Sequence, residues 1–307
     1  MKENYIELKE SRDFGDIINT YFEFFKLNLK SFTNVFISYN GIFIFLLLGI
    51  SYLMVTGFIG MYNVETGFGN GTQDESAMLV GFGVLLFFVV FIVIAALNYS
   101  LASSYMINYD EQKQVVTDKK LVWNIVRDNI GRILIFILLL AVIYVIYMII
   151  SLVLSFIPLI GFLAQNVIGF ALTAWFGISF MVMLNENKSP IDAFGEGWDL
   201  VKSNFWKTVG ANFILGILVG LILLLILMIP GIIVGVYTYH AVSIDTAIGE
   251  SVLAKVIYTF GLCIFFVVIA YSQSLSQFIN GILYYALHEE KYNVNTRQKI
   301  DQIGASE

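Results

Sequence analysis

The chain has 307 residues, of which 58% are hydrophobic and only 13% are charged, and its formal net charge is −6. A soluble domain carries about 25% charged residues, so a water-soluble globule of this size could not hide so much apolar surface, and the excess must face lipid. Composition therefore excludes a soluble enzyme and a disordered regulator, and the lack of a basic block excludes nucleic acid as a partner.

Six apolar stretches have the length of about 20 residues that a bilayer core requires. They predict spans near 35–62, 78–107, 132–157, 159–184, 208–237 and 252–287. Pro158 lies in the very short connection between the third and fourth spans and predicts a break there. Pro230 and Gly231 lie inside the fifth span, where continuing apolar residues predict a kink. The sequence therefore predicts an all-α polytopic membrane protein with six transmembrane helices.

Lysine and arginine fall almost entirely on one side of the predicted spans. Of the 17 basic residues, 16 share the side of the two chain ends, and Lys255 alone lies opposite. Because cytoplasmic segments are enriched in Lys and Arg, both termini are expected in the cytoplasm. The N-terminal segment is polar and acidic and has no signal-peptide core, so the first span is expected to direct insertion.

Three amphipathic segments each lead into a span and end in a shared pattern, in which a base is followed two residues later by Asn and then by a second base. The pattern occurs at Lys26, Asn28 and Lys30, at Arg127, Asn129 and Arg132, and at Lys202, Asn204 and Lys207. The second, fourth and sixth spans end in a second shared pattern, Glu-x-Lys, at 111–113, 186–188 and 289–291. Two markers in the same order, three times, predict an internal repeat.

The predicted repeat is one interfacial helix plus a helical hairpin. We expect a single membrane domain over 1–307, with repeats at about 13–113, 117–188 and 189–291 and a polar cytoplasmic tail at 292–307. In the third repeat, Ser189 and Pro190 are a favourable helix start. Ile191, Phe194, Trp198, Val201 and Phe205 then recur at helical spacing. Such segments are too charged to span and are expected to lie in the headgroup plane.

The repeated bases and asparagines are candidates for binding lipid headgroups. Lys26, Lys30, Arg127, Arg132, Lys202 and Lys207 could bind anionic phosphates, with hydrogen bonds added by Asn28, Asn129 and Asn204. The alternative is ordinary snorkelling and topology anchoring, which any inner-membrane protein requires, and we favour this alternative.

A polar face on the sixth span is the second candidate feature. It comprises Ser272, Gln273, Ser276, Gln277 and Asn280, with a weaker counterpart around Asn98 in the second span. The face could line a hydrophilic cavity, but interhelical hydrogen bonding that fixes the packing is the favoured interpretation. Two glycine pairs, Gly216/Gly220 and Gly231/Gly235, also have the spacing of close helix contacts.

No catalytic, metal or cofactor site is predicted. His240 and His288 fall on opposite faces of the membrane, and the single cysteine, Cys263, lies in an apolar run. No charged residue is predicted deep inside a span, although ion-coupled carriers usually need one. Phosphate-binding loops and nucleophile elbows do not appear.

The stretch from Ser189 to Lys207, SPIDAFGEGWDLVKSNFWK, resembles a signature of bacterial six-span proteins related to the membrane domain of glycerophosphoryl diester phosphodiesterases. The opening Asp13–Ile18 resembles the start of such proteins. The catalytic barrel of that family is not expected here, so no catalytic residue carries over. The resemblance implies a bacterial cytoplasmic (inner) membrane protein that stands alone.

These observations favour a non-enzymatic inner-membrane protein that organises lipid or supports a membrane protein assembly. Its expected partners are membrane lipid with anionic headgroups, and membrane proteins or further copies of the chain. The alternative is a transporter or channel for a small or amphipathic solute that uses the polar face of the sixth span.

Overall fold

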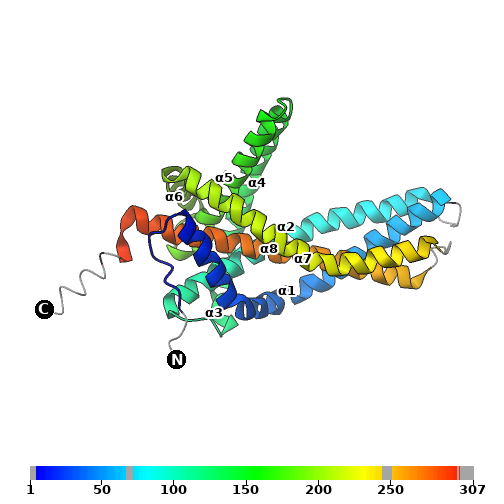
Figure 1. Cartoon of the computed structure of the whole chain (residues 1–307), viewed down its shortest axis with the longest axis horizontal. Helices are drawn as coiled ribbons and strands as arrows, with labels where there is room; N and C mark the ends of the chain where they lie inside the picture. The colour runs from blue at the N-terminus through cyan, green and yellow to red at the C-terminus, as the bar shows by residue number, and fades with distance from the viewer. Residues whose placement is uncertain (1–4, 67–71, 244–250, 296, 298–307) are drawn as a thin grey trace. The chain divides into compact units, whose positions relative to one another are not determined.

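All regular structure in the described part of the chain is helical. A computed structural model describes residues 5–66, 72–243, 251–295 and 297 (Figure 1). The helices are α1 (Phe14–Thr66), α2 (Gln73–Gln112), α3 (Lys119–Asp128), α4 (Ile130–Ser155), α5 (Ile160–Asn185), α6 (Pro190–Ser203), α7 (Phe205–Ser243) and α8 (Val252–Tyr292). Six of these, α1, α2, α4, α5, α7 and α8, are long and apolar enough to cross a membrane. The predicted all-α, six-span, multi-pass architecture is thus confirmed at the level of length and composition.

The amphipathic segments of the second and third predicted repeats form the short helices α3 and α6, which begin and end in similar ways. α3 begins after Asp118, whose side chain accepts a hydrogen bond from the Lys120 amide, and α6 begins after Ser189, which caps the Asp192 amide with Pro190 in the first turn. Asn129 ends α3 and Asn204 ends α6, and in each case a span follows directly. The serine-proline helix start is therefore confirmed.

In the first predicted repeat, no separate amphipathic helix forms, because α1 runs without interruption from Phe14 to Thr66. The Asn28 amide nitrogen donates to the Phe24 carbonyl 2.9 Å away, and the Asn28 Oδ1 accepts from the Tyr105 hydroxyl at 2.8 Å. The side chain is thus held along the helix and across to α2, and does not end the helix. At 53 residues, α1 exceeds the length of a single span, so part of it lies outside the hydrocarbon.

Proline interrupts the helical structure at one of the two predicted places and lies within a continuous helix at the other. α4 ends at Ser155 and α5 begins at Ile160, with Pro158 in the connection and Leu159 at a positive φ of 61°. In contrast, α7 continues through Pro230. A single missing backbone donor in a long apolar helix is therefore tolerated here.

Three of the spanning helices end in the same backbone conformation. Lys113 follows α2, Asn187 lies two residues after the end of α5, and Asn293 follows α8, with φ values of 54°, 55° and 52°. A residue in this left-handed region is a common way for a helix to end, because it lets the next amides reach back to the last carbonyls. The shared ending accompanies the Glu-x-Lys markers, while the threefold repeat as a whole stays a prediction.

The contacts divide the chain into two compact units. The first unit comprises Met1–Phe36, Ala96–Leu218 and Ser274–Glu307, and the second comprises Ile37–Ala95 and Val219–Gln273. Four helices, α1, α2, α7 and α8, therefore contribute one part to each unit. The candidate sites described below lie in the first unit, except where the second is named.

Aromatic side chains fill the core of the first unit between α1, α2 and α8. Phe278 lies 4.6 Å from Phe32 and 5.3 Å from Phe24, measured between ring centroids, and both pairs meet edge to face. Phe24 also meets Tyr109 edge to face at 5.0 Å, and Phe32 meets Tyr105 at 5.4 Å. All five rings are essentially inaccessible. Edge-to-face pairs of this kind add about 0.5–1.5 kcal/mol each beyond the burial of their area.

Close helix contacts occur at glycines that the sequence analysis did not single out. A Cβ at Gly177 of α5 would lie 2.1 Å from the Asn280 amide nitrogen of α8, and one at Gly197 of α6 would lie 2.1 Å from the Ser179 hydroxyl of α5. In contrast, a Cβ at Gly220, Gly231 or Gly235 would meet nothing within 4 Å. A Cβ at Gly216 would lie at an ordinary distance of 3.7 Å from the Phe170 ring of α5. The prediction of close contacts at the two spaced glycine pairs is therefore wrong, because at none of these four positions would a Cβ meet a neighbour more closely than ordinary packing allows.

The second unit also packs through small residues and contains an apolar hollow. Gly57 and Gly60 of α1 lie against α2 near Ser76. The hollow, of about 680 Å³, lies between α1, α7 and α8 and is lined by apolar side chains such as Phe58, Leu227 and Phe265.

Candidate functional site at the charged helix ends

The exposed bases are the first part of the candidate site. Lys26 and Lys30 on α1, Arg127 on α3 and Lys202 on α6 all have exposed side chains. Arg127 contacts the exposed carboxylate of its neighbour Asp128 at 3.2 Å, a contact worth little in water. These four side chains are therefore accessible from outside the protein.

The remaining two predicted bases have protein partners. Lys207 Nζ lies 2.6 Å from a Glu290 carboxylate oxygen of α8, and its side chain is only 19% exposed. Arg132 donates to the Asn187 side-chain oxygen at 3.3 Å. Both therefore connect the start of a span to the end of another helix.

The three predicted asparagines have structural contacts. Asn28 and Asn129 are buried, and each amide nitrogen donates to the backbone carbonyl four residues earlier at 2.9 Å. Asn204 is half-buried at the junction of α6 and α7, where its carbonyl accepts from the Thr208 hydroxyl. Asn28 and Asn129 are therefore held by bonds within their own helices, and Asn204 contributes its backbone carbonyl to the first turn of α7.

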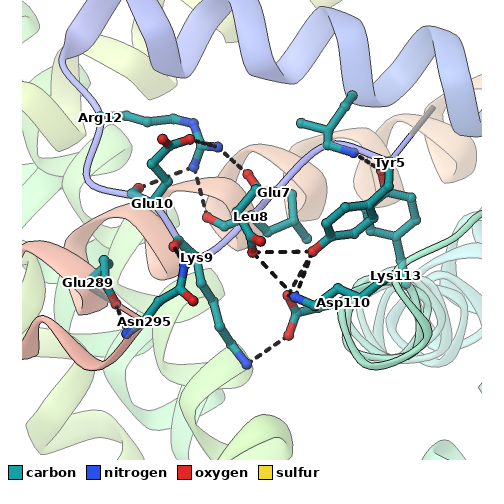
Figure 2. Close-up of polar contacts among 12 residues, drawn as sticks. Tyr5, Glu7, Leu8, Lys9, Glu10, Arg12, Asp110, Lys113, Glu289 and Asn295 are labelled. Carbon is teal, nitrogen blue, oxygen red and sulfur yellow. Dashed lines mark hydrogen bonds and ion pairs between the residues drawn. The ribbon is translucent and has the colours of Figure 1, made fainter. Parts of the chain in front are cut away.

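A network that sequence reasoning missed joins the N-terminal segment to the end of α2. Residues 5–13 precede α1, and Figure 2 shows Tyr5, Lys9 and Lys113 converging on Asp110. Lys9 Nζ lies 2.7 Å from one Asp110 oxygen and Lys113 Nζ lies 2.9 Å from the other. The Asp110 side chain is only 4% exposed, whereas both lysines are nearly half exposed. A buried carboxylate is thus neutralised by two partly hydrated ammonium groups.

Tyr5 completes this network. Its hydroxyl donates to Asp110 at 3.2 Å and accepts from Lys113 at 2.8 Å. Burial disfavours the Lys113 ammonium, but its hydrogen bonds to Tyr5 and Asp110 outweigh this effect and raise the pKa of Lys113 above its ordinary value. Lys113 therefore stays charged throughout the physiological range.

The same N-terminal segment also contacts the end of α8. The Asn295 side chain donates to the Lys9 carbonyl at 2.6 Å, and the Asn295 amide donates to Glu289 at 2.9 Å (Figure 2). Arg12 is buried and donates to backbone carbonyls of its own segment, at 2.8 Å to that of Leu8. Burial lowers the pKa of Arg12 from its usual value, although the guanidinium remains charged. The segment is thus held by side chains from two spans.

A second charged cluster lies where α5, α6 and α8 end or begin. Lys188 forms ion pairs with Glu196 and, at 2.8 Å, with Glu186. The Tyr292 hydroxyl donates to Glu196 at 2.7 Å, and the Tyr284 hydroxyl donates to Glu186 at 2.8 Å. Burial alone would raise the pKa of Glu196, but the hydrogen bonds from Lys188 and Tyr292 overcome this and lower it. Two of the three predicted Glu-x-Lys markers, at 111–113 and 186–188, thus supply a lysine to an ion-pair cluster, whereas the third, at 289–291, supplies Glu290 to the ion pair with Lys207.

Two residues of the polar face of the sixth span, Gln277 and Asn280, form hydrogen bonds to neighbouring helices. Gln277 is fully buried, and its amide nitrogen donates to the Ser103 hydroxyl of α2 at 2.8 Å and to the Gly177 carbonyl of α5 at 3.0 Å. The buried Asn280 donates to the Thr173 carbonyl of α5 at 3.3 Å. These contacts join three helices and favour the packing interpretation over a cavity.

The rest of the polar face is divided between the two units. Asn98 of α2 is fully buried, and its carbonyl accepts from the Ser274 hydroxyl at 3.5 Å. Ser276 hydrogen-bonds to Tyr99 of α2. Ser272 and Gln273 are half-buried and lie in the second unit, where Ser272 donates to a carbonyl of its own helix. Asn98, Ser276, Gln277 and Asn280 therefore lie in the first unit, and Ser272 and Gln273 in the second.

The apolar face of α6 differs from the one that the spacing predicts. Phe194 and Val201 are buried, together with Ala193, Gly197 and Leu200, but Ile191 is 72% exposed and Trp198 is 41% exposed. Trp206, in the first turn of α7, is 74% exposed. The buried face packs on α4 through the stacked rings of Phe136 and Phe194, and on α5 through the Trp175 nitrogen, which donates to the Phe194 carbonyl. The predicted stripe is thus split between core and surface.

Comparison with protein-family models, curated proteins and solved structures finds no match to this chain. Within the described residues, no three His, Cys, Asp or Glu side chains are grouped so that they could hold a metal ion. The site is therefore interpreted from its own geometry.

Proposed function

We propose that this chain is a non-enzymatic bacterial inner-membrane protein that organises lipid at the cytoplasmic interface. The observation that carries the proposal is the exposure of large apolar side chains beside an exposed base on α6 and α7. Ile191 and Trp206 are each more than 70% exposed, and Lys202 lies between them in sequence with an exposed side chain. A helix that has one face packed on protein and that exposes isoleucine, tryptophan and lysine is suited to the headgroup layer.

Two physical terms support a lipid contact at this place. Burying a large apolar side chain in lipid contributes about 1.5–3 kcal/mol, and a base near an anionic surface contributes about 1 kcal/mol. In this proposal the exposed bases Lys30, Arg127 and Lys202 recruit anionic lipid around the protein. The cytoplasmic position of both chain ends and the relationship to the phosphodiesterase membrane domain belong to the proposal and rest on the basic-residue distribution and the sequence resemblance.

The test is the lipid composition around the full chain, extracted with its native membrane into polymer-bounded nanodiscs. The proposal expects enrichment of anionic phospholipid over the bulk membrane. In the Lys30→Gln/Lys202→Gln variant, part of this enrichment is lost. The matched control, Lys291→Gln/Arg297→Gln, removes the same amount of charge from exposed positions at and after the end of α8. This control variant is expected to keep the enrichment of anionic phospholipid.

Two results would contradict the proposal. One is recovery of the protein with bulk lipid composition. The other is an equal loss of anionic lipid in the two variants, which would mean that net charge alone determines the composition. A protein partner that is retained in the nanodiscs while the lipid stays at bulk composition would favour support of a membrane assembly instead.

A further inference from the structure

A small hollow lies between the N-terminal segment and α1 in the first unit. Tyr5 and Ile6 form one wall, and Glu23, Lys26 and Leu27 form the other. The hollow has a volume of about 520 Å³. It is distinct from the ion-pair network around Asp110, although Tyr5 belongs to both. Polar and apolar side chains thus line one hollow beside the N-terminal part of α1.

The two charged groups of this hollow are opposite in sign and close in sequence. Glu23 and Lys26 are three residues apart on α1, so they lie on the same side of the helix, and both side chains are exposed. No ion pair or hydrogen bond joins either side chain to another group within the described part of the chain. The hollow therefore offers one hydrogen-bonding cation and one hydrogen-bonding anion to a ligand.

We propose that this hollow binds the zwitterionic headgroup of a phospholipid with a primary amine, of the phosphatidylethanolamine class. The lipid phosphate contacts the Lys26 ammonium, the lipid ammonium contacts the Glu23 carboxylate, and Ile6 and Leu27 contact the glycerol and the first methylenes. This inference rests on the proposed lipid-organising function and names the ligand at one of its positions.

Charge excludes a purely anionic headgroup as the preferred ligand. The net charge of Glu23 and Lys26 is zero, so an anionic headgroup gains one attractive contact and suffers one repulsive contact, whereas a zwitterion gains two attractive contacts. A quaternary ammonium is also disfavoured, because it has no N–H to donate to Glu23. An aromatic face could compensate, but the Tyr5 ring already stacks on Tyr109 at 5.1 Å and has Lys113 Nζ at 5.0 Å from its centroid.

The chain contains a matched control pair. Asp199 and Lys202 on α6 have the same spacing and the same order of charges, and both are exposed, but neither lines this hollow. The isosteric change Asp199→Asn therefore removes an acid next to a repeated base without altering the proposed site, and Glu23→Gln removes the acid of the site itself.

The experiment is native mass spectrometry of the full chain titrated with phosphatidylethanolamine, phosphatidylcholine and phosphatidylglycerol that carry identical acyl chains. The wild type is expected to bind phosphatidylethanolamine about two- to fivefold more tightly than either other lipid, as an exposed ion pair allows. Glu23→Gln reverses the preference toward phosphatidylglycerol, and Lys26→Gln weakens the binding of all three lipids. Asp199→Asn leaves the preference unchanged.

Three results would overturn the inference. They are equal affinities of the wild type for the three lipids, a preference that survives Glu23→Gln, or an equal shift in Glu23→Gln and Asp199→Asn. Glycerophosphoethanolamine has the same charges without acyl chains, and competition by it at concentrations equal to the lipid would assign the hollow to a soluble headgroup instead. Failure of the proposed lipid-organising function is recognised separately. That function is tested by the enrichment of anionic lipid in nanodiscs and its dependence on Lys30 and Lys202, and neither residue lines this hollow.

Discussion

Asp110 is a nearly buried carboxylate at the end of α2 that depends on partners far away in the sequence. Lys9 is about a hundred residues earlier in the chain, and Lys113 is one turn later. Asp110→Asn removes the charged acceptor that Lys9, Lys113 and Tyr5 share and leaves a buried amide in its place, so it is expected to destabilise the first unit by about 1–3 kcal/mol. Thermal unfolding in detergent, followed by loss of the native fluorescence, measures this change as a lower Tm.

The control for this prediction is Asp128→Asn. The Asp128 side chain is 63% exposed and contacts only its exposed neighbour Arg127 among the described ion pairs. We expect the free energy of unfolding of the Asp128→Asn variant to stay within about 0.5 kcal/mol of the wild-type value. Equal destabilisation by the two substitutions would show that the Asp110 network contributes nothing beyond general surface charge.

The cluster around Glu196 gives a pH dependence whose sign follows from its partners. Hydrogen bonds from Lys188 and Tyr292 lower the pKa of Glu196 below the ordinary value of 4.5. A carboxyl whose pKa is lower in the folded state stabilises the fold above the unfolded-state pKa, and this contribution disappears as the pH falls through the folded-state value. The Tm of the wild type should therefore fall as the pH is lowered below about 4.5.

The variant Glu196→Gln isolates this contribution. It should lower the Tm at pH 7 and flatten its dependence on pH below 4.5, while Asp199→Asn, at an exposed position of the same helix, should leave the slope unchanged. A wild-type Tm that is constant down to pH 3, or an identical slope in Glu196→Gln, would contradict the assignment.

At this scale the sequence located the right helix ends but not the interactions there. The Glu-x-Lys markers at 111–113 and 186–188 lie in the two ion-pair clusters, yet nothing local indicates that Tyr5 and Lys9 reach Asp110. Such partners are separated by more than a hundred residues and meet only because the helices pack. The only local indication of an ordered segment was the presence of Tyr5, Leu8 and Arg12 among the polar and acidic residues that precede the first helix.

At the scale of helices, one motif gives two structures. The base-x-Asn pattern ends a short helix at Asn129 and at Asn204, whereas α1 passes through Asn28 without a break. The difference lies in the tertiary partner, since the Tyr105 hydroxyl donates to the Asn28 side chain and holds it against α2. Propensity alone cannot separate these cases, because the Asn28 and Asn129 side chains both bond back to the carbonyl four residues earlier, although only Asn129 ends a helix.

Helix packing gives a prediction at the glycine of α5. Gly177 allows α8 to approach so closely that a Cβ would lie 2.1 Å from the Asn280 amide. Gly177→Ala should therefore separate the two helices, disturb the Gln277 and Asn280 hydrogen bonds, and destabilise the protein by about 1–3 kcal/mol. Resistance to unfolding in increasing concentrations of a denaturing detergent provides the measurement.

The matched substitution is Gly220→Ala in α7. Nothing lies within 4 Å of a Cβ at this position, so alanine should be neutral or stabilise the helix by a few tenths of a kcal/mol, up to about 1 kcal/mol. If Gly220→Ala were the more damaging change, the spaced glycine pair predicted from the sequence would be the true contact and the packing described here would be wrong.

At the scale of the whole molecule, composition predicted the architecture well. Six apolar stretches became six helices that could span a membrane, and Pro158 separates two of them while Pro230 does not. The division into two compact units was not predicted, because it depends on which halves of α1, α2, α7 and α8 contact one another. Hydropathy reports that a stretch is apolar and carries no information about its neighbours.

In the proposed topology, the charged helix ends face the cytoplasm, and Thr72, which directly precedes α2, faces the outside. Labelling of single cysteines with a membrane-impermeant maleimide tests it most directly, in a Cys263→Ser background that removes the native thiol. The account predicts that Thr72→Cys is labelled in intact spheroplasts, and that Glu10→Cys, Lys120→Cys and Ser203→Cys, all exposed in the structure, are labelled only after lysis. Labelling of Glu10→Cys, Lys120→Cys or Ser203→Cys in intact spheroplasts, or protection of Thr72→Cys there, would contradict it.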